Sequence, residues 1–193
     1  LMPIMIQFAI IGCGQIAARH AENIPAIGKL AAICDIDKSK ADAFGKKYNA
    51  RVYYTLEELL AGEKEVTVVC ICTPSGYHAE HSIKALQASK HVLCESPMCL
   101  TTAAAWQMIE TEKFCRQKLF VAETIIHNDA IKKVKEWLPE NIRTIKQVQL
   151  NYYVNRNEDY FSNWQGKLFP SGGALFTEMA PLINALLYLF GDI

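Results

Sequence analysis

Residues 12–17 read Gly-Cys-Gly-Gln-Ile-Ala, and this turn is the part of the sequence whose residue types most clearly predict chemistry. It follows the apolar run 6–11, which is typical of a buried strand, and it leads into residues 17–22, which predict the start of a helix. Glycines allow a tight turn and close approach of the backbone, and a helix N-terminus presents free N–H groups and partial positive charge. A strand, a glycine turn and a helix in this order predict a cradle for a pyrophosphate.

Asp35 supports this prediction because it follows the next apolar run, residues 30–34, at about the spacing of a carboxylate that binds the adenosine ribose. Two later apolar runs end in Thr-Pro-Ser at residues 73–75 and in Glu-Ser-Pro at residues 95–97. The carboxyl ends of parallel strands lie at one edge of a sheet, so these segments and the glycine turn should line one crevice. The alternative interpretation is a glycine turn in an α/β protein that binds no nucleotide.

Strands and helices are expected to alternate over the first two thirds of the chain. This alternation predicts an α/β fold with a doubly wound parallel sheet and right-handed crossovers. The expected strands are residues 6–11, 30–34, 51–54, 66–72, 91–95 and 119–122. The expected helices are residues 38–48, 55–60, 81–88 and 101–114.

The pattern changes from about Thr124. We expect a helix over residues 131–138 that ends before Pro139, then a long, alternating, tyrosine-rich strand over 145–154. A polar and aromatic stretch follows, and an apolar helix then runs from residues 171–173 to Phe190. A lone strand would expose unpaired N–H and C=O groups. The chain is therefore a fragment, or another subunit covers that strand, or the tail is disordered.

The composition excludes several classes of function. With 51% hydrophobic and 21% charged residues the chain is typical of a soluble, globular protein, and 20 basic and 20 acidic side chains leave no overall charge to attract nucleic acid or a membrane. No apolar stretch reaches the roughly 20 residues of a membrane span. The apolar N-terminus lacks a preceding basic region and predicts a strand, not a signal peptide. Seven cysteines without metal-ligand spacing predict reduced thiols in the cytoplasm and no metal site.

Four segments together resemble the glucose-fructose oxidoreductase / inositol dehydrogenase (Gfo/Idh/MocA) family: residues 12–17, residues 73–75 with His78, residues 95–97 and residues 171–173. The resemblance covers essentially the whole chain. Within the family, residues 160–166 and the glycines after them are most similar to UDP-N-acetylglucosaminuronate 3-dehydrogenases.

The resemblance implies a Rossmann NAD(P)-binding domain over residues 1–123. Residues 124–193 would begin an incomplete α+β open-sheet domain for substrate binding and homo-oligomerisation. The expected activity is hydride transfer between NAD(P) and a sugar or nucleotide-sugar. Asp35 without an adjacent arginine favours NAD over NADP, because a carboxylate repels the 2′-phosphate. The resemblance assigns cofactor contacts to Gly12, Gly14, Gln15, Ile16, Asp35, Thr73, Pro74, Ser75, His78, Glu95, Ser96 and Trp164.

The sequence departs from the family at the positions that move protons. The family usually has Glu-Lys-Pro, with a lysine that contacts the reacting hydroxyl, where this chain has Ser96. Thr177 and Pro181 stand where the family usually has Asp or Asn and an acid/base histidine, and Asn184 replaces a further acidic residue. The catalytic groups are therefore unassigned. The candidates are His127 and Glu178. The structural alternatives are a partly buried, hydrogen-bonded histidine for His127 and an exposed helix carboxylate for Glu178.

Two functions follow from these departures. One is an NAD(P)-dependent oxidoreductase with altered acid/base groups, and the other is a dinucleotide-binding pseudoenzyme that acts as a sensor or as partner of an active paralogue. A degraded gene product without activity is a third possibility. Four side chains keep a structural alternative: His78 as a hydrogen bonder at a helix start, Trp164 as a packing aromatic, and Arg19 and His20 as caps or decoration of the first helix.

Overall fold

The structure is a computed structural model that describes residues 5–191, apart from the side chain of Asn141. Residues 1–4 and 192–193, which the expected domain ranges include, lie outside the described residues. The chain divides into two compact units, with the boundary between Val121 and Ala122.

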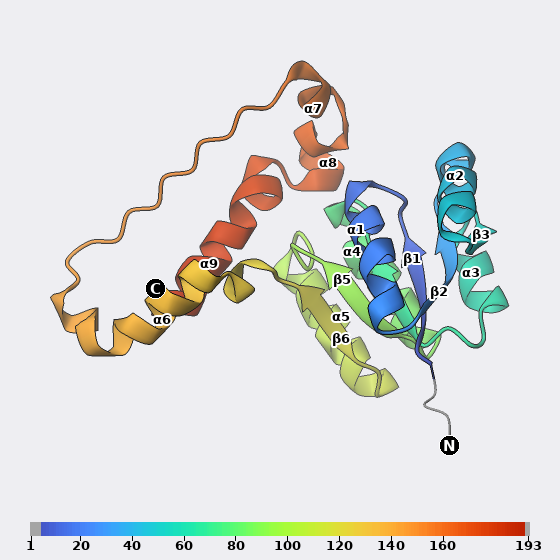
Figure 1. Cartoon of the computed structure of the whole chain (residues 1–193), viewed down its shortest axis with the longest axis horizontal. Helices are drawn as coiled ribbons and strands as arrows, with labels where there is room; N and C mark the ends of the chain where they lie inside the picture. The colour runs from blue at the N-terminus through green and yellow to red at the C-terminus, as the bar shows by residue number, and fades with distance from the viewer. Residues whose placement is uncertain (1–4, 192–193) are drawn as a thin grey trace. The chain divides into compact units, whose positions relative to one another are not determined.

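Six strands form one sheet in the order β3-β2-β1-β4-β5-β6 (Figure 1). The pairs β1–β2, β1–β4, β2–β3 and β4–β5 are parallel, which confirms the expected doubly wound sheet. The strand order reverses between β1 and β4, and ligands of such sheets bind at this switch point. The bounds are β1 (Gln7–Ile11), β2 (Lys29–Cys34), β3 (Arg51–Tyr53), β4 (Val68–Ile71), β5 (His91–Glu95) and β6 (Leu119–Ala122).

Five helices cover the sheet, and side-chain caps fix where three of them begin. The side chains of Asp37, Thr55 and Thr101 accept backbone N–H bonds from the first turns of α2, α3 and α5. The fourth helix begins at His78, three residues before the expected start at His81. The bounds are α1 (Gln15–Asn23), α2 (Lys38–Tyr48), α3 (Leu56–Gly62), α4 (His78–Gln87) and α5 (Thr102–Cys115).

Apolar side chains are buried on both faces of the sheet, as expected for parallel strands with continuous apolar runs. Ala9 and Ile11 of β1 pack in one cluster with side chains from α3, α4 and α5. Phe8 and Ile10 pack in a second cluster with side chains from α1 and α2. The alternation along β1 therefore assigns two helices to one face and three to the other.

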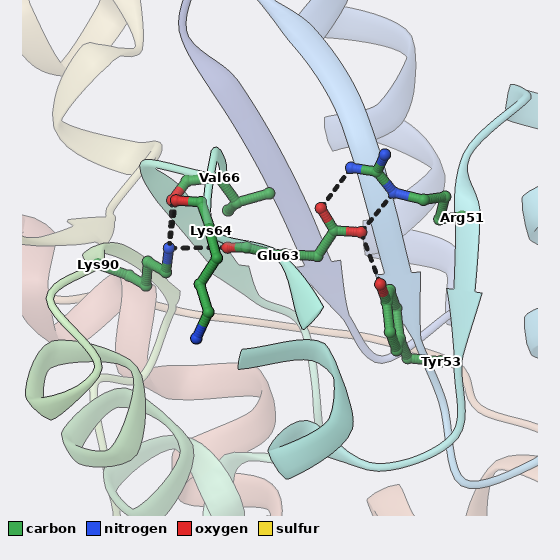
Figure 2. Close-up of polar contacts among 6 residues, drawn as sticks. All are labelled: Arg51, Tyr53, Glu63, Lys64, Val66 and Lys90. Carbon is green, nitrogen blue, oxygen red and sulfur yellow. Dashed lines mark hydrogen bonds and ion pairs between the residues drawn. The ribbon is translucent and has the colours of Figure 1, made fainter. Parts of the chain in front are cut away.

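A buried polar cluster that the sequence analysis did not predict lies between α3, β3 and the start of β5 (Figure 2). Glu63 is 1% exposed and accepts hydrogen bonds from Arg51 and from the hydroxyl of Tyr53. Lys90 is 6% exposed, and its Nζ donates to the carbonyl oxygens of residues 63, 64 and 66 at 2.8, 3.1 and 2.7 Å. Burial lowers the pKa of Lys90 below its usual value. These bonds hold the segment that follows α3 in place.

The second unit begins with the 3-10 turn Ile125–His127 and α6 (Asp129–Asn141). Asn128 caps α6 by accepting the N–H groups of Ala130 and Ile131. The expected end before Pro139 is wrong, because this proline lies inside the helix. A proline removes one N–H donor, and here the last turn still closes through the bond from the Ile142 N–H to the Leu138 carbonyl.

The strand expected over residues 145–154 is not formed. Residues 145–157 are drawn in Figure 1 as an extended segment between α6 and α7 (Glu158–Ser162), without assigned strand structure. A strand requires hydrogen bonds to a neighbouring strand. Within residues 5–191 no strand pairs with this segment, and residues 146–157 are exposed. The alternating pattern therefore predicted the extended conformation but not the pairing.

The chain then folds into α8 (Leu168–Ser171), a π-helical turn (Leu175–Met179) and α9 (Ala180–Phe190). Taken together, Leu168–Phe190 contains an 18-residue window with a mean hydropathy of 1.4 and has the length and composition of a membrane-crossing helix, which corrects the expectation that no stretch reaches that length. The expectation counted only uninterrupted apolar residues. Length and composition are weak evidence, and Gly172 and Gly173 interrupt this stretch with φ angles of 83° and 78°.

Candidate functional site

The glycine turn predicted as a phosphate cradle lies between β1 and α1. Gly12 has a φ of +91°, and a Cβ at this position would lie 2.7 Å from the carbonyl oxygen of Cys72. Apart from Gly14 and its two neighbours in the chain, no atom of the described residues lies within 4 Å of the position that a Cβ would take on Gly14. Gln15 and Ile16 begin α1, whose first turn contains no acidic side chain and receives no side-chain cap. This open, uncapped helix N-terminus fits a pyrophosphate.

Asp35 is held above the glycine turn by two backbone N–H groups. Oδ2 accepts the N–H of Cys13 at 2.7 Å, and Oδ1 accepts the N–H of Asp37 at 2.8 Å. Each carboxylate oxygen can accept a second hydrogen bond, so both remain able to bind ribose hydroxyls. The turn predicted to bind the pyrophosphate and the carboxylate predicted to bind the ribose are thus directly bonded.

Ile36 is a candidate that the sequence analysis missed. It directly follows Asp35 and its side chain is 89% exposed. An exposed apolar side chain beside the carboxylate predicted to bind the ribose offers a surface against which an adenine ring can pack. The sequence could have indicated it, because a large apolar residue lies between two aspartates just after the end of the predicted strand.

The segments after β4 and β5 lie at the same edge of the sheet, and His78 joins them. His78 is 2% exposed; its Nδ1 lies 2.8 Å from the carbonyl oxygen of Pro97, and its Nε2 lies 2.7 Å from that of Thr73. Burial lowers the pKa of His78. His78 is the first residue of α4 and both of its ring nitrogens face backbone oxygens, which supports the helix-start interpretation over direct cofactor contact. Pro74 and Ser96 are partly exposed here, whereas Ser75 is buried.

Glu95, the last residue of β5, contacts a side chain from α1. Its Oε1 lies 2.5 Å from Nε2 of His20, which projects from α1. The interpretation of His20 as a cap or decoration of the helix is therefore wrong. The two residues are 75 positions apart in sequence, and no local pattern could have paired them.

The second unit contains the remaining candidates. Glu178 is not an exposed helix carboxylate: its side chain is 11% exposed and accepts bonds from Arg156 at 2.9 and 2.8 Å and from the hydroxyl groups of Tyr160 and Tyr152 at 2.6 and 3.2 Å. His127 is exposed, and Trp164 is partly exposed in a 3-10 turn. Their predicted roles at the nicotinamide stay predictions.

The residues that the resemblance places at the usual acid/base positions of the family lie in the second unit. Thr177 donates to the carbonyl of Gly173 at 3.1 Å, and Pro181 lies in the first turn of α9. Asn184 donates to Oε2 of Glu123 at 2.5 Å.

Replacing Glu178 with glutamine should reduce the acid sensitivity of the second unit. The hydrogen bonds from Arg156 lower the pKa of Glu178 below its usual value of 4.5. A lowered pKa contributes stability above the unfolded-state value, and that stability is lost as the pH falls through the folded-state value. The variant should be less stable by about 1 kcal/mol near neutral pH and equal to wild type in acid. Acid unfolding followed by tryptophan fluorescence tests this, with the exposed Glu136→Gln as control; equal curves for wild type and Glu178→Gln would contradict it.

The buried thiols should be unreactive in the folded protein. Burial is the main cause that raises the pKa of Cys13, Cys34, Cys70 and Cys94 to about 12, and the pKa of Cys72 lies well above its usual value. We expect Ellman's reagent to modify only Cys99 and Cys115, which are partly exposed, until denaturant is added. Rapid modification of all seven thiols in the native protein would refute this. Among residues 5–191 no group of three or more His, Cys, Asp or Glu side chains is placed to hold a metal ion.

A family model described as an oxidoreductase family with an NAD-binding Rossmann fold matches residues 6–123. D-glucoside 3-dehydrogenase of Escherichia coli is 38% identical over 112 residues, which are 56% of this chain and 32% of that protein. Oxidoreductase P35 of Formosa agariphila is 27% identical over 199 residues, which are 97% of this chain and 61% of that protein.

Solved structures of WlbA dehydrogenases share the fold. The enzyme of Chromobacterium violaceum, in complex with NADH and UDP-GlcNAcA, has a TM-score of 0.90 at 26% identity, covering 100% of this chain and 57% of its own. The enzyme of Bordetella pertussis, with the same ligands, has a TM-score of 0.90 at 25% identity and the same coverage. The chain therefore spans less than two thirds of each relative. Because the family model covers more than half of the chain, this protein belongs to the Gfo/Idh/MocA oxidoreductase family.

Proposed function

We propose that the chain binds NAD and forms part of a dehydrogenase that acts on an alcohol group of a sugar or nucleotide-sugar. The observation that carries the proposal is the direct bond between the Cys13 N–H of the glycine turn and the carboxylate of Asp35. It supports one continuous surface for a pyrophosphate and a ribose. When bound, NAD supplies the hydride acceptor, and the protein positions it and excludes competing reactions.

The residues at the ribose end favour NAD over NADP. A 2′-phosphate would meet the carboxylate of Asp35, and the next residue is Ile36, not an arginine that could neutralise the phosphate. Both Asp35 oxygens already accept backbone N–H bonds, so the carboxylate cannot turn away without losing them. NADPH should therefore bind more weakly than NADH.

The similarity to the two WlbA structures, which contain UDP-GlcNAcA, supports a nucleotide-sugar as substrate. We place substrate binding and homo-oligomerisation in the domain that begins at about residue 124, and cofactor binding in the domain up to about residue 123. The seven cysteines, which lack metal-ligand spacing, support a cytoplasmic location. The other predicted cofactor contacts, Thr73, Pro74, Ser75, Ser96 and Trp164, remain part of this proposal.

A second candidate function is a dinucleotide-binding pseudoenzyme. Ser96, Thr177 and Pro181 favour it, because three positions that usually carry acid/base groups lack them. Restoring the lysine with Ser96→Lys distinguishes the two functions. Turnover of UDP-GlcNAcA by the wild-type protein supports the enzyme. Turnover that appears only in the Ser96→Lys variant, with NADH binding equal in both proteins, supports the pseudoenzyme.

Asp35→Asn should weaken NADH binding about 10- to 100-fold, since hydrogen bonds to a charged group contribute about 1.5–3 kcal/mol. NADH fluorescence titration measures the effect. Asp42→Asn is the matched control, because Asp42 is an exposed carboxylate on α2 whose hydrogen bond is to Tyr54. Equal affinity of wild type and Asp35→Asn would show that Asp35 does not bind the ribose.

A further inference from the structure

His20 and Glu95 form an ion pair between α1 and the end of β5. Nε2 of His20 lies 2.5 Å from Oε1 of Glu95, and the side chains are 19% and 17% exposed. Oε2 of Glu95 accepts the backbone N–H of Ser96 at 3.3 Å. Within residues 5–191, Nδ1 of His20 has no hydrogen-bond partner. Both members of the pair therefore keep some contact with solvent and some free hydrogen-bonding capacity.

The other titratable groups at this edge of the sheet are already engaged. Asp35 accepts two backbone N–H bonds, and both nitrogens of His78 lie against carbonyl oxygens. Nδ1 of His81 lies 3.0 Å from the Thr73 hydroxyl, and its ring stacks on Tyr77. The charge of Glu95 also raises the pKa of three nearby thiols, which burial keeps protonated: Cys70, Cys72 and Cys94.

We propose that the His20–Glu95 pair exchanges the proton of the redox reaction in this site. The inference rests on the proposed function, because it requires a dinucleotide bound at the edge where Glu95 lies. Ser96 has no useful acid/base chemistry near neutral pH, and Glu95 of the pair directly precedes it in the chain. A carboxylate and an imidazole within hydrogen-bond distance can pass a proton from one to the other. Imidazole ordinarily changes charge near neutral pH, which suits the pair to proton exchange.

The proton balance of alcohol oxidation gives the pair a defined task. The C–H bond breaks and its hydrogen leaves with two electrons as a hydride to the nicotinamide. The O–H bond also breaks, and the carbon and oxygen form a carbonyl group. The released proton enters the pair at Glu95 and is retained as an imidazolium on His20. The nicotinamide of NAD⁺ carries a positive charge that NADH lacks, so a proton on the pair would be less favoured with NAD⁺ bound than with NADH bound.

This difference makes the binding of the two dinucleotides respond differently to pH. In wild-type protein, the ratio of the NAD⁺ to the NADH dissociation constant should fall as the pH is raised, on the order of tenfold, because a proton on the pair opposes NAD⁺ more than NADH. The ratio is measured by calorimetric titration of each dinucleotide alone, so no substrate is needed. In His20→Gln the ratio should be independent of pH. In Glu95→Gln, which lacks the carboxylate that holds the imidazolium, the pH dependence should be weaker than in wild type. His91→Gln, at the opposite end of β5, is the matched control and should keep the wild-type dependence.

The outcomes separate this inference from the function on which it rests. Failure of the folded wild-type protein to bind either dinucleotide overturns both. Binding with a ratio that does not change with pH, or that changes equally in wild type and His20→Gln, overturns only the role of the pair. Should Glu95→Gln fail to fold by circular dichroism, the comparison of His20→Gln with His91→Gln decides the question. A pH-dependent ratio in wild type and His91→Gln, and a constant ratio in His20→Gln, supports the proposal.

Discussion

Replacing Gly12 with alanine is expected to destabilise the protein by about 2–5 kcal/mol and to abolish dinucleotide binding, since both a left-handed conformation and an overpacked site act against the new side chain. Gly12 has a φ of +91°, which side chains rarely adopt. Its Cβ would lie 2.7–2.9 Å from the backbone atoms of Cys72 and Thr73, which cannot move aside without shifting the end of β4. Urea unfolding and NADH titration measure the two effects.

Gly14→Ala is the matched control, and it separates stability from binding. Gly14 has a φ of −83°, and its Cβ would enter open space. We expect a free energy of unfolding close to that of wild type. NADH should nevertheless bind less tightly, because the new methyl group occupies space where the pyrophosphate approaches the backbone. Wild-type stability in Gly12→Ala would show that the turn tolerates a side chain and that the close approach to Cys72 does not constrain it.

Replacing Lys90 with methionine is expected to lower the free energy of unfolding by about 3–5 kcal/mol, since each buried acceptor left without a donor costs about 1–3 kcal/mol. Methionine fills a similar volume but donates no hydrogen bond. The carbonyl oxygens of residues 63, 64 and 66 would lose the Nζ donor that they share. Urea unfolding followed by circular dichroism measures the loss.

Lys84→Met is the control for this substitution. Nζ of Lys84 lies 2.8 Å from both Glu57 and Glu80, but its side chain is 41% exposed. Exposed ion pairs contribute about 0–1 kcal/mol, so this variant should lose at most that amount. Equal losses in the two variants would mean that the buried contacts of Lys90 are no stronger than surface ion pairs.

The sheet could be predicted from sequence because its signals are local. Short segments rich in apolar and β-branched residues predicted all six strands, and the periodicity of residues 38–48 gave the bounds of α2. Long-range contacts set the features that were missed. The helix α4 begins at His78, whose side chain bonds to Pro97, and no strand forms over 145–154 without a partner to pair with.

The candidate site divides in the same way. The spacing from the glycine turn identified Asp35, because a Rossmann crossover has a nearly fixed length. His20 could not be assigned from sequence, because its partner Glu95 comes from a strand two positions away in the sheet from β1. Glu178 looked like a solvated helix residue because the pattern within its helix gives no sign of Arg156, which is 22 residues earlier.

Titration of the purified wild-type chain with NADH tests the central claim most directly. We predict saturable binding of one NADH per chain with a dissociation constant in the roughly micromolar range, about −8 kcal/mol. NADPH should bind more weakly, because its 2′-phosphate meets Asp35. The absence of saturable NADH binding by protein that circular dichroism shows to be folded would contradict the account. It would leave the glycine turn and Asp35 as parts of a Rossmann scaffold without a dinucleotide.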